Sequence, residues 1–296
     1  MFQGCGTVFE LTPSPGIAKA SIVPWNEIVL HLFTGGSDGG NPQGNLTFDQ
    51  SGNMYGTAGG GGNQNCWGGC GVIYKLSPSD GGWTETVLYP FQGKDDGMNP
   101  GGGVVFDSSG NLYGESAGAY GNGYGAIYQL SPSGSDWTEQ IIYTFTANDD
   151  GFAPAGGLIV DSSGNLYGTT ASGGHYYHGG GTVFQLTPRS DGGWTFTTLY
   201  RLSGERNCGP KDRLFMDASG NLYGTTYCDG DEAIGSVFKL TPSDGNWTYT
   251  SLHDFTGGSD GLYPRSGVIL DAKGDLYGTA SGGGTYNYGL VWQITP

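Results

Sequence analysis

Short apolar runs, separated by clusters of Gly, Asp, Ser and Asn, recur along the whole chain. One copy reads "GLIVD" (157–161), "NLYGTT" (165–170), "GTVFQLTP" (181–188) and "WTFTTLYRL" (194–202). Runs of this length that are rich in β-branched and aromatic residues predict strands. The polar clusters between them predict tight turns. We therefore expect antiparallel units of four strands, named A to D in chain order, and no helices.

The motif "SGNLYG" and its variants mark five copies of this unit. Their tyrosines are Tyr55, Tyr113, Tyr167, Tyr223 and Tyr277, which are 58, 54, 56 and 54 residues apart. This period is close to that of propeller blades and too long for most solenoids. Four-stranded sheets protect their edges when they are arranged radially. The sequence predicts an all-β, five-bladed β-propeller that forms a single domain over residues 1–296.

The number of predicted strands differs from the number that five blades require. Strands A, B and D occur five times, whereas strand C occurs six times, at 6–13, 71–78, 125–132, 181–188, 235–242 and 289–296. We expect strand 25–33 to pair with strand 289–296, because an exchange between the two termini removes the last open edge. Strand 6–13, in an irregular segment over residues 1–24, is then surplus. It either packs outside the closing blade or belongs to a further blade of a longer protein.

The repeated segments resemble those of a known family. "GTVFELTPS" and "DSSGNLYGTT" resemble the Gloeo/Verruco repeat of bacterial secreted proteins, and the order "GLIVDSSGNLYGT" followed by "GTVFQLTP" resembles the blades of NHL-type propellers. The resemblance covers nearly the whole chain. It implies a tandem-repeat array and an extracellular or cell-surface location. It brings no established catalytic residues.

Charge and hydropathy narrow the possible partners. The chain has 27 acidic and 11 basic residues, a net charge of −16, which repels nucleic acid and anionic lipid. No apolar run approaches the 18 residues of a membrane span. We expect a monomer that binds neither nucleic acid nor the interior of a membrane.

Five cysteines predict two disulfides. Cys66 and Cys70 lie in one glycine-rich loop, and Cys208 and Cys228 lie in two loops that the repeat brings together. We expect both pairs to be oxidised and Cys5 to be free. Two disulfides indicate an oxidising compartment.

The loops between strands B and C differ in every copy, and in a propeller with strand A innermost they share one face with the D-to-A loops. Variable loops on a rigid scaffold are common binding sites. Aromatic rings among polar residues suit sugars, although the same rings are suited to packing between blades. The candidates in these loops are Trp67, Tyr120, Tyr124, Tyr176, Tyr177, Tyr227, Tyr286 and Tyr288. His175 and His178 either donate hydrogen bonds to a ligand or, less favourably for want of a third ligand, bind a metal.

The fourth copy carries charges where the others carry small residues. Lys211, Asp212 and Arg213 stand at the start of its strand A, Arg206 precedes them, and Arg265 follows in the next copy. The group is either a ligand-binding sector or a network of structural ion pairs. Glu115 is a second anomaly, because the other copies have Thr at its position.

An aspartate recurs in the D-to-A loop of every copy except the fourth, which has Asn207, and such repetition favours structure over chemistry. We expect Asp38, Asp96, Asp150 and Asp260 to cap their own turns through backbone hydrogen bonds. The alternative is a ring of carboxylates that binds Ca²⁺. No cofactor is expected.

Three functions remain open. The first is a secreted module that binds a glycan or another surface polymer through the variable loops and the charged sector. The second is a glycan hydrolase or lyase, which requires two carboxyl groups across the scissile bond. Its candidate acids are Glu115, Asp212, Asp229, Asp231 and Glu232. The third is a structural protein of a surface array.

Overall fold

The computed structural model describes residues 5–13, 25–117, 123–154, 156–175, 179–204 and 208–295. These residues form 23 strands, β1 to β23, and no helix. Within the described segments, therefore, no helix has the length and apolar character that a membrane span requires. The all-β class is confirmed.

Four blades have the predicted antiparallel order of strands A, B, C and D. Blade 1 contains β3 (Gly40–Phe48), β4 (Met54–Gly60), β5 (Val72–Ser79) and β6 (Gly82–Pro90). Blade 2 contains β7 (Gly101–Phe106), β8 (Leu112–Ser116), β9 (Ala126–Ser133) and β10 (Asp136–Thr144). Blade 3 contains β11 (Phe152–Pro154), β12 (Ile159–Val160), β13 (Leu166–Ser172), β14 (Thr182–Pro188) and β15 (Trp194–Arg201), and blade 4 contains β16 (Phe215–Met216), β17 (Leu222–Thr226), β18 (Ser236–Ser243) and β19 (Asn246–Asp254).

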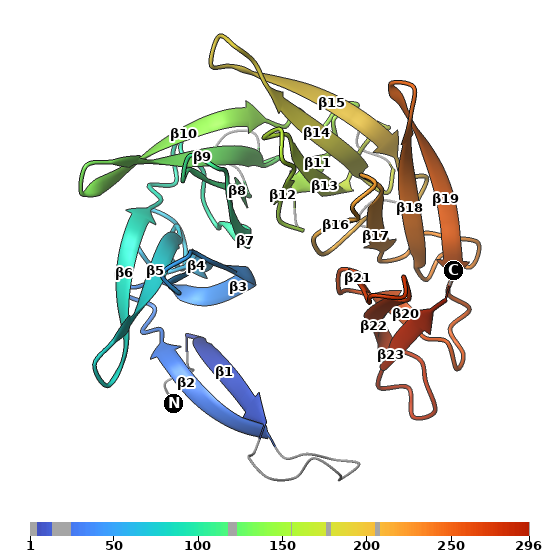
Figure 1. The fold of residues 1–296 in the computed structure, drawn as a ribbon, viewed down its shortest axis with the longest axis horizontal. Coiled ribbons are helices and arrows are strands. Elements are labelled where there is room, and N and C mark those ends of the chain that lie inside the picture. Colours follow the sequence, from blue (N-terminus) through green and yellow to red (C-terminus); the bar gives the residue numbers. More distant parts are fainter. Residues whose placement is uncertain are drawn as a thin grey trace.

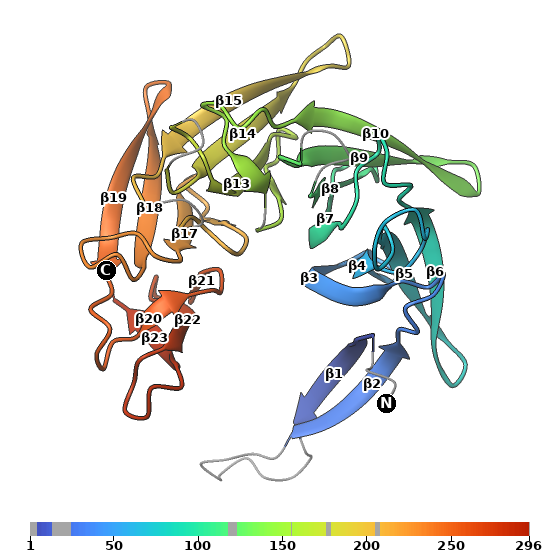
Figure 2. The same cartoon turned by 180° about the vertical axis from the view of Figure 1, so that it is seen from behind.

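The two ends of the chain form smaller sheets. The N-terminal hairpin is β1 (Thr7–Pro13) and β2 (Trp25–Leu32). Blade 5 has strands A, B and C only, formed by β20 (Leu262–Pro264), β21 (Ile269–Leu270), β22 (Leu276–Gly282) and β23 (Leu290–Ile294). The sheets follow one another around a common centre in a propeller-like arc, and a gap separates the hairpin from blade 5 (Figures 1 and 2).

The predicted closure between the termini is wrong in this structure. Strand β2 pairs with β1 from Thr7↔Leu32 to Pro13↔Trp25. Strand β23 pairs with β22, and no other described strand pairs with it. The surplus strand is thus the partner of β2 rather than an outer addition. A hairpin between neighbouring strands closes a much shorter loop than a pairing of the two termini, so its entropic cost is lower. Five complete blades are not found.

The turn after strand A explains most of the "SGNLYG" motif. In blade 1, the Asp49 carboxylate accepts hydrogen bonds from the backbone N–H groups of Ser51 and Asn53, at 2.9 and 3.0 Å. It also accepts from the Asn53 side-chain amide at 2.7 Å and the Tyr55 hydroxyl at 3.0 Å. Asp107, Asp161 and Asp217 make the same four bonds in blades 2 to 4. One carboxylate therefore fixes both the turn and the tyrosine of the motif, which lies near the start of strand B.

The last glycine of the motif is required by an aromatic ring on strand C. A Cβ atom on Gly114 would lie 2.2 Å from the Tyr128 hydroxyl, and one on Gly168 would lie 2.5 Å from Phe184. Tyr74, Phe238 and Trp292 cover Gly56, Gly224 and Gly278 in the same way. These strand C residues are buried in the core that neighbouring blades share. The core of the molecule thus lies between blades.

Neighbouring blades touch at their inner strands through backbone atoms. Asn45 of β3 and Gly103 of β7 form a single parallel bridge. A Cβ atom on Gly102 would lie 2.4 Å from the Gly157 nitrogen, and Gly157 itself has φ +83°. Only glycine combines that φ with that approach. Farther out, aromatic rings of strand D stack across the same interfaces, as Tyr143 does on Phe196 with centroids 4.1 Å apart.

Candidate functional site

The Cys66–Cys70 disulfide closes a tight loop between β4 and β5, as predicted. Both cysteines are buried, whereas Trp67 between them is fully exposed. The Gly61 N–H donates to Gly68 at 2.9 Å and the Cys70 N–H donates to Asn63 at 2.9 Å. The loop therefore holds an exposed indole ring on a rigid backbone.

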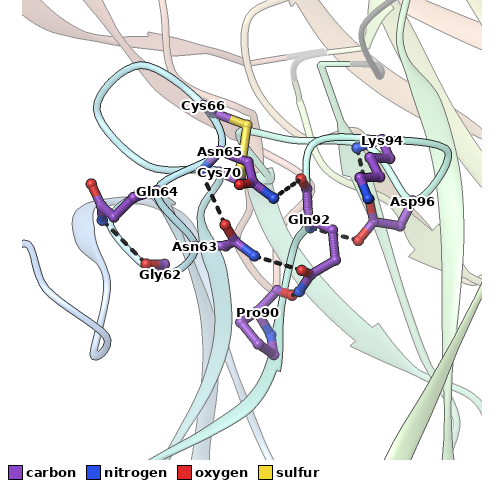
Figure 3. The surroundings of a disulfide bond; sticks show 10 residues. All are labelled: Gly62, Asn63, Gln64, Asn65, Cys66, Cys70, Pro90, Gln92, Lys94 and Asp96. Atoms are coloured by element: carbon purple, nitrogen blue, oxygen red, sulfur yellow. Dashed lines mark hydrogen bonds between the residues drawn. A yellow bond between two sulfur atoms is a disulfide. The ribbon is translucent and has the colours of Figure 1, made fainter.

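Side-chain amides fix this loop to the segment that follows β6. Figure 3 shows Asn63 and Asn65 directed at Gln92 beside the disulfide. Asn63 donates to the Gln92 side-chain oxygen at 2.5 Å, and Asn65 donates to the Gln92 carbonyl at 3.4 Å. Gln64 and Asn65 are themselves exposed. The surface around Trp67 thus offers amide donors and acceptors next to a flat apolar ring.

The other predicted loop residues differ in their surroundings. Tyr286 and Tyr288, in the loop before β23, are 81% and 92% exposed. Tyr124 is half-buried and packs edge-on against Phe152, so its ring contributes to packing, which was the alternative to sugar binding. His175 is exposed in the loop between β13 and β14. The remaining candidates, which are Tyr120, Tyr176, Tyr177, His178 and Arg206, lie outside the described residues.

The Cys208–Cys228 disulfide, also as predicted, joins the D-to-A and B-to-C loops of blade 4. The Cys228 N–H donates to the Cys208 carbonyl at 3.1 Å, and the Tyr227 N–H donates to Gly209 at 3.2 Å. These bonds place Tyr227 beside the start of the charged strand A. Cys5 belongs to neither disulfide.

Tyr227 is the centre of the charged sector. Its ring stacks on Tyr263 with centroids 5.0 Å apart. The Arg265 guanidinium lies 4.7 Å from the ring centroid and donates to the Tyr227 hydroxyl at 3.2 Å. The Lys211 ammonium lies 5.8 Å from the same centroid. The ring is therefore a platform for two cations and does not offer a free face to a sugar.

The acid between Lys211 and Arg213 serves the backbone. One Asp212 carboxylate oxygen accepts from the Arg213 N–H at 2.7 Å, and the other accepts from the Gly267 N–H of blade 5 at 2.8 Å. Asp212 thus ties blade 4 to blade 5. It forms no ion pair with the described basic residues around it.

Glu115 performs a similar task between blades 2 and 3. Its side chain is completely buried, and one carboxyl oxygen accepts from the Gly157 N–H at 2.9 Å. The other oxygen has no hydrogen-bond partner among the described protein atoms. Burial raises the pKa of Glu115 to about 8, against a smaller lowering by the Gly157 N–H. A neutral, enclosed carboxyl group of this kind suits a structural bridge.

The three remaining acidic candidates lie together in the loop between β17 and β18. Ser203 donates to Asp229 at 3.4 Å, while Asp231 and Glu232 are exposed. None of the three forms an ion pair within the described part of the chain.

The aspartates of the D-to-A loops cap their own turns. Asp150 accepts from the Thr146 and Asn148 N–H groups at 2.8 and 3.1 Å, and from the Tyr143 hydroxyl at 2.9 Å. Asp38, Asp96 and Asp260 accept backbone hydrogen bonds in the equivalent way. His253 replaces the tyrosine and contacts Asp260 at 3.2 Å. No described group of three or more His, Cys, Asp or Glu residues has an arrangement suited to a metal ion.

Comparison with solved structures gives several distant similarities. A candidate 6-phosphogluconolactonase from Bacteroides uniformis matches with a TM-score of 0.51 and 14% identity, over 91% of this chain and 71% of that one. An α-L-arabinanase from Cellvibrio cellulosa matches with a TM-score of 0.43 and 13% identity, over 86% and 90%. A β-xylosidase/α-arabinofuranosidase from a compost microbial metagenome matches with a TM-score of 0.42 and 12% identity, over 86% and 89%. At 14% identity, the match to the candidate 6-phosphogluconolactonase shows a similar fold and says nothing about activity.

Comparison of sequences assigns the family. No curated protein matches the chain. The Gloeobacter/Verrucomicrobia repeat matches twice, over residues 1–193 and 122–296, and so covers the entire sequence. The chain belongs to the Gloeobacter/Verrucomicrobia repeat family.

Proposed function

We propose that this protein is an extracellular scaffold that binds a glycan through the face formed by the B-to-C and D-to-A loops. The observation that carries the proposal is Trp67, a fully exposed indole ring held between two buried, disulfide-bonded cysteines. Leaving such a ring in water is unfavourable, and a partner that covers it gains both apolar contact and specificity. The protein acts as a secreted monomer without a cofactor, and its arc folds as one domain.

A sugar suits the surroundings of Trp67 better than an apolar surface does. The exposed amides of Gln64 and Asn65 can bond hydroxyl groups at the rim of the ring. Because the loop is already fixed by the disulfide and by Gln92, little conformational entropy is lost on binding.

Binding is favoured over hydrolysis by the placement of the candidate acids. Glu115 is enclosed, and Asp212 is committed to two backbone N–H groups. Asp229, Asp231 and Glu232 belong to a single loop, whereas the two carboxyl groups of a glycosidase stand on opposite sides of the scissile bond. An assay for release of reducing sugars from each bound polysaccharide tests the catalytic alternative directly.

The test of the proposal is a polysaccharide array probed with the wild-type protein, Trp67→Ala and Trp25→Ala. Trp25 is the matched control, because it is also an exposed tryptophan but lies on the N-terminal hairpin. We expect Trp67→Ala to weaken binding about tenfold or more, as for other tryptophan hot spots, and Trp25→Ala to leave it unchanged. Equal binding by all three proteins, or no binding to any polysaccharide, would overturn the proposal.

A further inference from the structure

Two cations occupy the same repeat position in neighbouring blades. Lys211 follows Pro210 at the start of strand A in blade 4, and Arg265 follows Pro264 in blade 5. The equivalent residues in blades 1 and 2 are Gln43 and Gly101. Both cationic groups lie over the single ring of Tyr227, at 5.8 and 4.7 Å from its centroid. Two positive charges therefore lie together where blade 4 meets blade 5.

Neither cation is neutralised by a described carboxylate. The ion pairs of arginine in the described residues lie elsewhere, between Arg189 and Asp191 and between Arg201 and Asp149. Asp212, which follows Lys211 in the sequence, accepts hydrogen bonds from backbone N–H groups with both carboxylate oxygens. Burial, and then the positive charge of Arg265, lower the pKa of Lys211. Two like charges near each other are unfavourable, and a bound anion would remove that penalty.

The surroundings hold these cations in place before any ligand arrives. Tyr227 is fixed by its stack on Tyr263 and by the adjacent Cys208–Cys228 disulfide. The hydrogen bond from Arg265 to the Tyr227 hydroxyl orients the guanidinium. An anion that binds here meets donors whose conformational entropy is already partly lost.

Building on the glycan binding proposed above, we infer that Lys211 and Arg265 form a subsite for the acidic group of a charged sugar, a carboxylate or a sulfate ester. The planar guanidinium of Arg265 matches either group with two parallel N–H donors, and Lys211 supplies a second, point-like charge. The protein as a whole, with a net charge of −16, repels a polyanion. The subsite therefore selects an acidic sugar unit at one place on the face, and the protein does not bind polyanions in general.

The test compares polymers that differ in charge alone. Polygalacturonate is set against its fully methyl-esterified form, and dextran sulfate against dextran, each with wild type, Arg265→Gln, Lys211→Met and the control Arg189→Gln. Arg265 is exposed, so its replacement leaves the fold intact, which thermal melting verifies. We expect at least one acidic polymer to bind about tenfold more tightly than its neutral counterpart, the two subsite variants to lose this preference, and Arg189→Gln to keep it.

The outcomes separate this inference from the proposed function. Preference for polygalacturonate identifies a carboxylate, and preference for dextran sulfate identifies a sulfate ester. Equal binding of each acidic polymer and its neutral partner, or a preference that survives in both subsite variants, overturns the subsite while glycan binding stands. Absence of binding to these polymers and to every polysaccharide on the array overturns both.

Discussion

The carboxyl group of Glu115 accepts a hydrogen bond from the Gly157 N–H at 2.9 Å and so joins blade 2 to blade 3 inside the molecule. Burial raises its pKa to about 8. In the unfolded chain a glutamate loses its proton near pH 4.3. Between these values the folded state holds a proton that the unfolded state has lost, so the free energy of unfolding falls as pH rises.

We therefore expect Glu115→Gln to flatten the pH dependence of stability. The wild-type free energy of unfolding should fall by about 1.4 kcal/mol per pH unit because of this residue, from about pH 5 to pH 8. Burial raises the pKa values of Glu139 and Glu85 to about 7, helped by the Asp96 and Asp38 carboxylates respectively, so these residues add a pH dependence that ends about one unit lower and remains in the variant. Urea denaturation at both ends of this range measures the effect, with the exposed Glu232→Gln as control. Parallel pH profiles for wild type and Glu115→Gln would contradict the assignment.

Gly168→Ala should destabilise the protein by about 1 to 3 kcal/mol, which is typical of an overpacked core. The added methyl group would lie 2.5 Å from Phe184 and 2.8 Å from Leu158. Gly258→Ala is the control, because nothing lies within 4 Å of a Cβ atom there. Thermal denaturation compares the two variants. Phe184→Leu should lessen the cost of Gly168→Ala, and failure of that rescue would argue against direct contact as the cause.

Asp217→Ala should lower the free energy of unfolding at pH 7 by about 1 to 3 kcal/mol, because it leaves buried donors without an acceptor. Although burial pushes the pKa of Asp217 up, hydrogen bonds from Asn221, Ser219 and Tyr223 lower it overall. A lowered pKa means that the stabilisation is present above about pH 4 and is lost as pH falls further. The difference in the free energy of unfolding between the variant and the wild type should therefore be smaller at pH 3 than at pH 7. Asp231→Ala, in an exposed loop, should leave the free energy of unfolding unchanged at both pH values. An equal loss of stability in both variants would refute the role given to the Asp217 turn.

The two disulfides should contribute unequally to stability. Cys208 and Cys228 are 20 residues apart, whereas Cys66 and Cys70 are 4 apart. The longer loop gains about 3 kcal/mol in the chain-entropy model, and the shorter one gains less. Melting temperatures of the Cys208→Ser/Cys228→Ser and Cys66→Ser/Cys70→Ser variants compare them. A larger loss in the second variant would show that native-state packing around the short loop outweighs chain entropy.

Much of the fold could be predicted because each blade repeats its own local signals. Short apolar runs set the strands, and the polar clusters between them, with the Asp that bonds to Asn and Tyr, set the turns, so the first four blades follow from the chain alone. The disulfides followed from the repeat, which brings Cys208 and Cys228 together. The partner of strand 25–32 could not be predicted in this way. Strands 6–13 and 289–296 are both copies of strand C with equivalent sequence patterns, so either could pair with it.

The candidate site was less predictable, since it depends on contacts between blades. A glutamate in place of threonine indicated an unusual position, but the enclosure of Glu115 depends on the backbone of blade 3. Lys211 and Arg265 were expected near one another, yet their convergence on Tyr227 depends on side-chain conformations from two blades. The exposure of Trp67, in contrast to the packing of Tyr227, was likewise not encoded in residue type alone.

The glycine contacts at the inner strands have a consequence for the shape of the array. Gly102 and Gly157 let two backbones meet near the centre, whereas Tyr143 and Phe196 hold the same two blades apart by the thickness of stacked rings farther out. The interface between blades 2 and 3 is thus a wedge, narrow inside and wide outside, and an interface of this shape curves the arc. At such an interface, residue size at two radii contributes to how tightly the protein bends. Larger residues at the inner rim would straighten it.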